Sequence, residues 1–317
     1  MSLQQAVGAM PALANQRTAY LNGEYLAESQ VLLPFRDRGF LYGDAVFDTT
    51  RTFGHRIFRL QAHVDRLYRS LRYLRIDPGL APEQMIAITE EVLERNRHLL
   101  DSGGDYWVSQ RVSRGVASVD GEEPPRAGAT VLVECTPLPL RERAALYRDG
   151  IRVIVPAQRR TPAEALSPRA KTSNYLNMIV ADQEVSAIDP GAWAVLLDMQ
   201  GHLAEGRGSN LFLVSAGELL TPKALNVLPG ISRQTVLELA AELGIPRREA
   251  DLDLYDAYAA DEAFLTSTSL CLCPVRSING MQVGGEEVFG PVTRRLIEAY
   301  RVLVGCDFVE QYRRHLP

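Results

Sequence analysis

The stretch RAKTSNYLN, residues 169–177, holds one of the only two lysines, Lys171 and Lys223, among the 34 lysines and arginines of the chain. Everywhere else the sequence uses arginine for positive charge. Arginine stays protonated at any accessible pH, whereas a lysine amine can lose its proton and act as a nucleophile. Lys171 is therefore a candidate for chemistry, most simply Schiff-base formation. The alternative is a solvated lysine at the start of a helix, and this stretch alone leaves both open.

Length and composition limit the classes of protein to consider. A chain of 317 residues is long for one hydrophobic core, so we expect two domains. A net charge of −5 gives no reason to expect nucleic acid or an anionic membrane as a partner, and no apolar run approaches the roughly 20 residues of a membrane span. The N-terminus, MSLQQAVGAMPALANQ, lacks the pattern of a signal peptide. We expect a cytoplasmic protein with a loose extension at residues 1–15.

Several familiar signatures are missing from the sequence. Cys271 and Cys273, in LCLCPV, fall on one face of an expected strand, whereas zinc sites usually space cysteines by two or more residues. The five histidines are scattered, so we expect no metal site. GRGSN at 206–210 contains G-x-G, but strands flank it, which excludes a dinucleotide fingerprint. No sequence feature supports a Ser-His-Asp hydrolase.

The first part of the chain is predicted to form a small α+β domain over residues 1–136. Asn22-Gly23 is a hairpin turn between strands. Helices are predicted at 61–76, where apolar residues recur at the spacing of one helix face, and at 82–96. Further strands are expected in 41–53, 55–60, 105–115 and 129–138. The segment 137–149 is predicted to be an interdomain linker.

The second part is predicted to form a larger, mixed, β-rich domain over residues 150–317. Strands are expected in 151–157, 261–269 and 273–278, with hairpin turns at Gln200-Gly201, Ala216-Gly217 and Asn279-Gly280. Helices are expected in 174–187, 231–244 and 290–304.

Four dispersed groups suit a cofactor that reacts with an amine. Glu205 precedes a glycine-rich turn at a strand end and could keep a heterocyclic nitrogen protonated, although it could also be surface decoration. LPGISR (228–233) is either an ordinary Pro-Gly turn or the start of a helix whose free N–H groups bind an anion. LTSTS (265–269) offers hydroxyls, and Arg59 is an always-charged group suited to phosphate. Together with Lys171 they describe a pocket for pyridoxal phosphate.

The order and spacing of several motifs are specific. They are YGDAVFDTTR (42–51), RLQAHVDRL (59–67), KTSNYL (171–176), EGRGSNLF (205–212), LPGISR (228–233), TSTSLCLCPV (266–275) and GPVTRRL (290–296). With these motifs the chain resembles the class IV, or fold type IV, pyridoxal-phosphate aminotransferases over residues 21–305. This family includes branched-chain aminotransferases, D-amino acid aminotransferases and aminodeoxychorismate lyase. The resemblance implies a two-domain fold type IV enzyme.

The resemblance also implies roles for individual residues. Lys171 would form the Schiff base with the cofactor, Glu205 would pair with the pyridine nitrogen, and Tyr175 would lie near the phenolic oxygen. The phosphate would be held by Arg59, the backbone amides of Ile231 and Ser232, and Thr268. Ser269 would be a further cofactor-binding residue. The substrate pocket would contain Tyr42, Phe47, Thr49, Trp107 and Val108. In this family the tyrosine that matches Tyr42 reaches across a dimer interface, so a homodimer or larger homo-oligomer is expected.

Departures from the family's motifs concern the substrate carboxylate. Branched-chain enzymes carry an arginine two residues after a tyrosine in the strand that matches DYWVSQRVSRG, but here Val108 stands at that position. The Arg-x-His of D-amino acid enzymes is also missing, with Val119 and Gly121 in its place. Arg51, Arg111 and Arg114 are the available substitutes. Asp48-Thr49-Thr50 replaces the Glu-Gly pair of branched-chain enzymes, and a threonine like Thr49 occurs in the lyase.

We therefore expect an aminotransferase that moves an amino group from a hydrophobic, branched-chain-like amino acid to a 2-oxo acid. One alternative of the same fold is a D-amino acid or (R)-amine transaminase. Another is a lyase of the aminodeoxychorismate type. A catalytically silent cofactor-binding protein is the remaining alternative, and Lys171, Glu205 and Arg59 argue against it.

Overall fold

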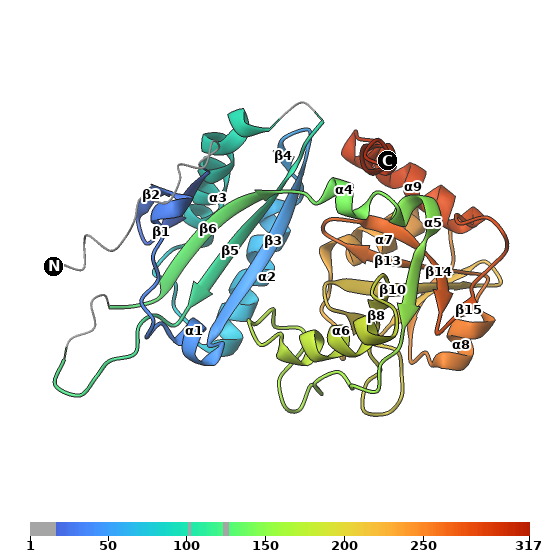
Figure 1. Ribbon diagram of the computed structural model, residues 1–317, viewed down its shortest axis with the longest axis horizontal. Helices are drawn as coiled ribbons and strands as arrows, with labels where there is room; N and C mark the ends of the chain where they lie inside the picture. Colours follow the sequence, from blue (N-terminus) through green and yellow to red (C-terminus); the bar gives the residue numbers. More distant parts are fainter. Residues whose placement is uncertain (1–16, 101–102, 123–126) are drawn as a thin grey trace.

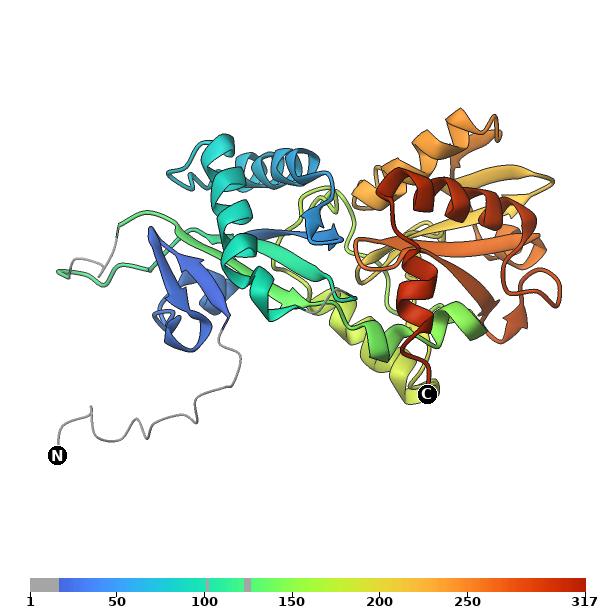
Figure 2. The same cartoon turned by 90° about the horizontal axis from the view of Figure 1, so that it is seen from above.

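The computed structural model describes residues 17–100, 103–122 and 127–317, so the extension predicted at 1–15 lies outside the described residues. The chain forms two β-sheets that lie side by side, each with its own helices (Figure 1). Figure 2 shows the same two halves from above. The predicted mixed architecture with two sheets is confirmed. No helix among the described residues is long and apolar enough to cross a membrane.

The first sheet has six strands in the order β2-β1-β6-β5-β3-β4, and every neighbouring pair is antiparallel. The predicted turn at Asn22-Gly23 joins β1 to β2, and both residues have positive φ, 53° and 107°, as this kind of two-residue turn requires. The strands are β1 (Thr18–Leu21), β2 (Glu24–Ala27), β3 (Ala45–Phe53), β4 (Arg56–Ile57), β5 (Tyr106–Ser113) and β6 (Thr130–Pro137).

Two long helices, α2 and α3, cover one face of this sheet. Side chains alternate along a strand, so Val46 of β3 and Val108 of β5 turn toward the helices and are fully buried with Leu67 of α2. Phe47 and Trp107, their neighbours in sequence, project from the other face. The helices of this half are α1 (Arg38–Tyr42), α2 (Leu60–Leu74) and α3 (Pro82–Asn96), with single 3-10 turns at Glu28–Gln30 and Arg97–Leu99.

The second sheet has nine strands in the order β12-β11-β10-β13-β14-β7-β8, with β9 paired to β10 and β15 paired to β14. The turns at Ala216-Gly217 and Asn279-Gly280 have positive φ at all four residues, which confirms the predicted hairpins. The strands are β7 (Ile151–Ile154), β8 (Trp193–Ala194), β9 (Glu205–Gly206), β10 (Ser209–Ser215), β11 (Glu218–Pro222), β12 (Arg247–Ala250), β13 (Glu262–Ser267), β14 (Cys271–Ile278) and β15 (Met281–Gln282).

Helices α7 and α9 pack on each other and on β13 and β14, and α6 packs on β8. Cys271 and Cys273 are buried in the core of this half, as predicted. Phe212 and Phe264 stack at the centre of the sheet with ring centroids 5.0 Å apart. The helices are α6 (Leu176–Ile188), α7 (Ile231–Glu242), α8 (Leu254–Ala259), α9 (Pro291–Val304) and α10 (Phe308–Arg313).

Residues 137–149, predicted to be a linker, fold into the short helices α4 (Leu140–Arg143) and α5 (Leu146–Asp149). Tyr147 is fully buried in the core of the second half and stacks on Tyr312 of α10 with ring centroids 4.9 Å apart. The connection between the sheets is therefore part of the packed second half, which fixes the direction of its side chains.

Besides α4 and α5, three elements of the second half were not predicted. The strand β12 has the sequence RREA, which lacks alternating apolar residues, and it is an edge strand held by parallel pairing with β11. Helices α8 and α10 have only six residues each, too few for a helical period to show in the sequence. Their capping residues, Asp253 and Asp307, were the available signal, because both side chains accept hydrogen bonds from the first turn.

We expect Tyr147→Ala to lower the free energy of unfolding by about 3–5 kcal/mol, the range for truncating a large side chain in a core. The control is Arg148→Ala. Arg148 is the next residue, is exposed, and pairs only with Asp149 among the described residues, so its loss should change stability by less than about 0.5 kcal/mol. Chemical denaturation measures both, and equal small effects would mean that α5 is not part of the core.

Candidate active site

The loop that carries Lys171 comes after β7 of the second sheet, but its backbone is hydrogen-bonded to the first half of the molecule. Thr172 forms an isolated antiparallel bridge with Val46 of β3. The carbonyl of Lys171 accepts a hydrogen bond from the N–H of Phe47 at 3.0 Å, and its own N–H donates to the hydroxyl of Ser70 on α2 at 3.0 Å. These bonds fix the backbone of Lys171 where the two halves meet.

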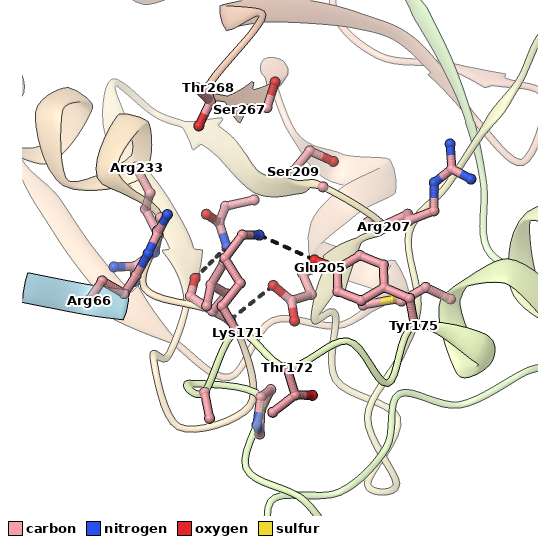
Figure 3. A pocket seen from close by; sticks show the side chains of 18 of the residues that line it. Arg66, Lys171, Thr172, Tyr175, Glu205, Arg207, Ser209, Arg233, Ser267 and Thr268 are labelled. Atoms are coloured by element: carbon pink, nitrogen blue, oxygen red, sulfur yellow. Dashed lines mark hydrogen bonds between the residues drawn. The ribbon is translucent and has the colours of Figure 1, made fainter. Parts of the chain in front are cut away.

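The side chain of Lys171 lines a cavity together with Tyr175, and Figure 3 shows its amine pointing toward the tyrosine hydroxyl. The Nζ atom donates to that hydroxyl at 3.2 Å and lies 4.5 Å from the centre of the Phe47 ring. Lys223 is exposed and pairs with Asp251. Of the two lysines, Lys171 alone lines this first cavity.

Glu205 lines the same cavity and is only 4% exposed. Its Oε1 accepts a hydrogen bond from Nε of Arg160 at 3.0 Å, and its Oε2 accepts one from the N–H of Leu228 at 2.9 Å. Burial raises the pKa of Glu205, while the charge of Arg160 and the bond from Leu228 oppose that rise. The result is a buried, oriented carboxyl group that could face a cationic ring nitrogen.

The start of α7 supplies an anion site in the first cavity. Ile231 and Ser232 line it, and the first N–H groups of a helix have no partner within the helix. Gly230, the N-cap, leaves room that a side chain would fill, because an added Cβ would lie 2.2 Å from a side-chain oxygen. The hydroxyls of Ser209 and Thr266 line the cavity, buried and without a hydrogen-bond partner among the described residues. Buried polar groups of this kind are usually satisfied by a ligand or water.

Arg59 was predicted to bind the phosphate, but Arg66 is the arginine of this motif that lines the first cavity. Arg59 pairs with Glu238 of α7 at 2.6 Å and does not line the cavity, whereas Arg66 is buried and lines it. RLQAHVDRL contains both arginines, nearly two helical turns apart and so on the same side of α2, which is why the motif did not distinguish them. The signal for Arg66 was its place between His63 and Ser70, polar residues on the buried face of α2.

Asp48 orients Arg66. The Nε and Nη2 atoms of Arg66 donate to Asp48 at 2.8 and 2.7 Å, and Nδ1 of His63 lies 2.7 Å from the same carboxylate. Burial acts to raise the pKa of Asp48, but the charge of Arg66 and the hydrogen bonds from Arg66 and His63 outweigh it and hold that pKa below its usual range. Burial lowers the pKa of His63, so we assign a neutral ring that donates from Nδ1. Arg66 thereby keeps its charge and its direction in a buried site.

A second cavity adjoins the first and shares Lys171 with it. Phe47, Thr49 and Trp107 line it, because these residues project from the face of the first sheet that α2 and α3 leave uncovered. Trp193 of β8 adds a further apolar ring from the second half. The second cavity therefore brings large apolar surfaces next to a lysine amine.

Three more predicted residues can be placed relative to these cavities. Thr268 lines both, and its hydroxyl donates to the carbonyl of Thr49 at 3.2 Å. Ser269 was predicted to bind the cofactor but lines only the second cavity. Tyr42 is 63% exposed and lines neither cavity of its own chain.

Four residues predicted to lie near the substrate line neither cavity. Val108 is fully buried under the helices because it alternates with Trp107 along β5. Arg51 is 2% exposed and is held by two backbone carbonyls and a glutamine. Arg111 pairs with a glutamate of β6, and Arg114 pairs with an aspartate that precedes β3. None of the three arginines predicted to bind the substrate carboxylate therefore lines either cavity.

The arginines that do line the cavities come from segments that the sequence indicated as helix face, loop or linker. Arg66, Arg160 and Arg233 line the first cavity, Arg143 lines the second, and Arg207 lines both. Arg207 lies between the two glycines of EGRGSNLF, so its position in that motif was a usable signal. Arg143 carried no such signal, because it lies in the predicted linker and in none of the motifs that carry the family resemblance.

Comparison with known proteins identifies the family of this chain. The family model described as amino-transferase class IV matches residues 45–278. This chain belongs to the class IV aminotransferases. It is 37% identical over 286 residues to a protein of Methanocaldococcus jannaschii, covering 89% of this chain and 94% of that protein. It is 30% identical over 290 residues to the branched-chain-amino-acid aminotransferase of Escherichia coli K12, covering 89% and 91%.

Solved structures show the same fold. The Escherichia coli branched-chain amino acid aminotransferase superposes with a TM-score of 0.82 at 28% identity, covering 91% of this chain and 95% of that chain. The branched-chain aminotransferase of the archaeon Thermoproteus uzoniensis, solved with norvaline, superposes with a TM-score of 0.81 at 28% identity, covering 95% and 98%. These similarities confirm the predicted fold type IV architecture.

Class IV aminotransferases use pyridoxal phosphate, and one branched-chain aminotransferase of this fold was solved with pyridoxamine 5'-phosphate. The first cavity fits the cofactor. Lys171 offers the amine, and Glu205 a carboxylate for the ring nitrogen. The start of α7 and Arg66 offer positive charge for the phosphate. The unpaired buried hydroxyls are the independent sign that a polar group belongs in this cavity.

We expect Arg66→Gln to weaken binding of pyridoxal phosphate to the apoprotein by roughly 10- to 100-fold, because it removes charge-assisted hydrogen bonds worth about 1.5–3 kcal/mol. Arg59→Gln should change the dissociation constant by less than about threefold. Absorbance titration measures both, with circular dichroism to check that each variant is folded. A larger effect at Arg59 would restore the sequence-based assignment.

Proposed function

We propose that this protein transfers the amino group of a branched-chain or similar hydrophobic amino acid to a 2-oxo acid, with pyridoxal phosphate bound covalently at Lys171. One observation carries the proposal. The amine of Lys171 shares a cavity with the buried carboxyl group of Glu205 and the anion-binding start of α7, in a chain that belongs to the class IV aminotransferases.

Each residue has a defined task in this proposal. The amino donor would take the place of Lys171 on the cofactor. The freed Lys171 amine would then take the proton from Cα of the substrate and deliver it to the cofactor. The cofactor, when bound, supplies a protonated ring that accepts the electrons left at Cα. Glu205 keeps that ring protonated, and Tyr175, whose hydroxyl lies 3.2 Å from Nζ of Lys171, orients the amine. Arg66 and the first amides of α7 hold the phosphate.

The hydrophobic donor follows from the second cavity and from the relatives. Phe47, Trp107 and Trp193 surround the space beside Lys171 with apolar surface, and burying a leucine-sized side chain contributes roughly 1.5–3 kcal/mol. The similar proteins described above include branched-chain aminotransferases. They favour transamination over the lyase alternative, which rested on Thr49 alone.

We also propose that the enzyme works in the cytoplasm. All four cysteines are free, and three of them are buried. Unpaired cysteines are typical of proteins from reducing compartments.

The purified enzyme should convert L-leucine and 2-oxoglutarate to 4-methyl-2-oxopentanoate and glutamate. Borohydride reduction before the assay should fix the cofactor to Nζ of Lys171 and abolish activity. Lys171→Arg should lower kcat by at least about 1,000-fold, because guanidinium cannot serve as the amine. Lys223→Arg is the matched control and should retain activity, since Lys223 is exposed and pairs only with Asp251 among the described residues.

Product analysis separates the possible outcomes. An adduct on Lys223, or none, would contradict the assignment of Lys171. A clear preference for D-alanine over L-leucine would replace the branched-chain proposal by a D-amino acid transaminase. Release of pyruvate from aminodeoxychorismate without any amino acceptor would replace it by the lyase.

We further propose a homodimer in which Tyr42 of one chain reaches the active site of the other. Support comes from a run of exposed apolar side chains in and before α1, where Leu32, Phe35, Phe40 and Tyr42 are 79%, 71%, 76% and 63% exposed. A contiguous exposed apolar segment is typical of an interface between protein chains. The family resemblance supports a place for Tyr42 at that interface.

Phe40→Glu should weaken the dimer at least about tenfold, because it places a charge in a buried apolar contact, and activity should fall with it at nanomolar concentration. Tyr255→Glu is the control, since Tyr255 is 79% exposed on α8, in the other half of the chain. Sedimentation at several concentrations measures both. A fully active wild-type monomer would contradict the proposed dimer.

A further inference from the structure

Arg143 ends α4 and reaches from the connection between the sheets into the second cavity, which Lys171 also lines. Its guanidinium lies over two tryptophan rings, 5.2 Å from the centre of Trp107 and 5.5 Å from that of Trp193. Nη1 donates to the hydroxyl of Ser269. Two rings and a hydroxyl hold the charged group in place from both halves of the molecule.

Arg143 has no acidic partner among the described residues, because no carboxylate there lies within 4.0 Å of its guanidinium. The bond to Ser269 is its one side-chain hydrogen bond within the described parts of the chain, although a guanidinium carries five N–H donors. Burial lowers the pKa of Arg143 below its usual value. By contrast, the charge of Asp48 outweighs burial and raises the pKa of Arg66. A partly buried cation without a counterion is costly unless an anion joins it.

The other arginines near the cavities are already paired. Arg207 lines the second cavity but forms an ion pair with Asp182 at 2.9 Å. Arg160 is bonded to Glu205, Arg66 to Asp48, and Arg233 to Glu249. Arg143 thus differs from every other cavity-lining arginine of the described chain in having no carboxylate.

We propose that Arg143 binds the α-carboxylate of the amino donor and of the 2-oxo acid, an inference that rests on the proposed transamination. The planar guanidinium can meet a carboxylate with two parallel N–H···O bonds. The carboxylate supplies the missing counterion, and the tryptophans that hold Arg143 also contact the apolar part of the substrate. Selection for a carboxylate thus comes from α4, in the segment that connects the two sheets.

The test compares Arg143→Gln with Arg141→Gln, its neighbour on α4, which is exposed and makes no side-chain bond to a described residue. Half-reactions use L-leucine and 3-methylbutan-1-amine, the same molecule without the carboxylate, and follow the absorbance of the bound cofactor. Arg143→Gln should raise the L-leucine concentration that gives half the limiting rate by roughly 10- to 100-fold, with a small change in the limiting rate itself. The same concentration for the amine should stay unchanged. Arg143→Lys keeps the charge but loses the paired bonds, so its effect with L-leucine should lie between those of the wild type and Arg143→Gln. Arg141→Gln should match the wild type.

Binding of a nonreactive analogue makes the inference independent of turnover. The holoenzyme is titrated with 4-methylpentanoate and with 4-methylpentanamide, which lacks the charge. Arg143→Gln should weaken binding of the acid by roughly 10- to 100-fold and leave the amide unchanged.

Unchanged binding of the acid, or an equal loss for acid and amide, overturns the role of Arg143. A wild-type holoenzyme that leaves L-leucine unconverted contradicts the proposed function instead, and the role of Arg143 is then decided by the two titrations alone.

Discussion

The active site depends on the backbone hydrogen bonds that join the loop of Lys171 to β3. The short strand β4 pairs with β3 only at Thr52 and Phe53, which leaves the edge of β3 free where the strand begins. Thr172 and Lys171 occupy that edge. Because an unpaired strand edge has strong hydrogen-bonding groups to satisfy, this contact both closes the sheet and fixes the reactive amine between the two halves.

Two kinds of arginine surround this amine, and they differ in their counterions. Arg66 and Arg160 are held by buried carboxylates, so their directions are set before any ligand arrives. Arg143 is held by aromatic rings and a hydroxyl, and no carboxylate of the described chain meets it. In a buried ion pair the carboxylate already balances the charge of the arginine. The paired arginines therefore stay charged and oriented without a ligand. The unpaired one retains affinity for an incoming anion.

Much of the fold followed from local patterns. Apolar spacing located α2, α3 and α9, and turn residues located the hairpins at Asn22-Gly23 and Asn279-Gly280. The elements that escaped prediction were those held mainly by their neighbours. The strand β12 lacks an apolar pattern of its own, and the helices of the connecting segment are about one turn long. Their stability comes from tertiary packing, which a short window of sequence does not contain.

The sequence by itself determined which chemistry is possible. Lys171 stood out because it is one of two lysines in an arginine-rich chain, and Glu205 and the start of α7 lie within motifs whose local conformation follows from a few adjacent residues. Only the tertiary structure decided which arginines serve the site. Arg59 and Arg66 share one side of a helix, so the choice between them depends on what packs against each end. Arg143 and Lys171 are far apart in the chain and line one cavity only because α4 packs on the second half while the lysine loop pairs with the first sheet.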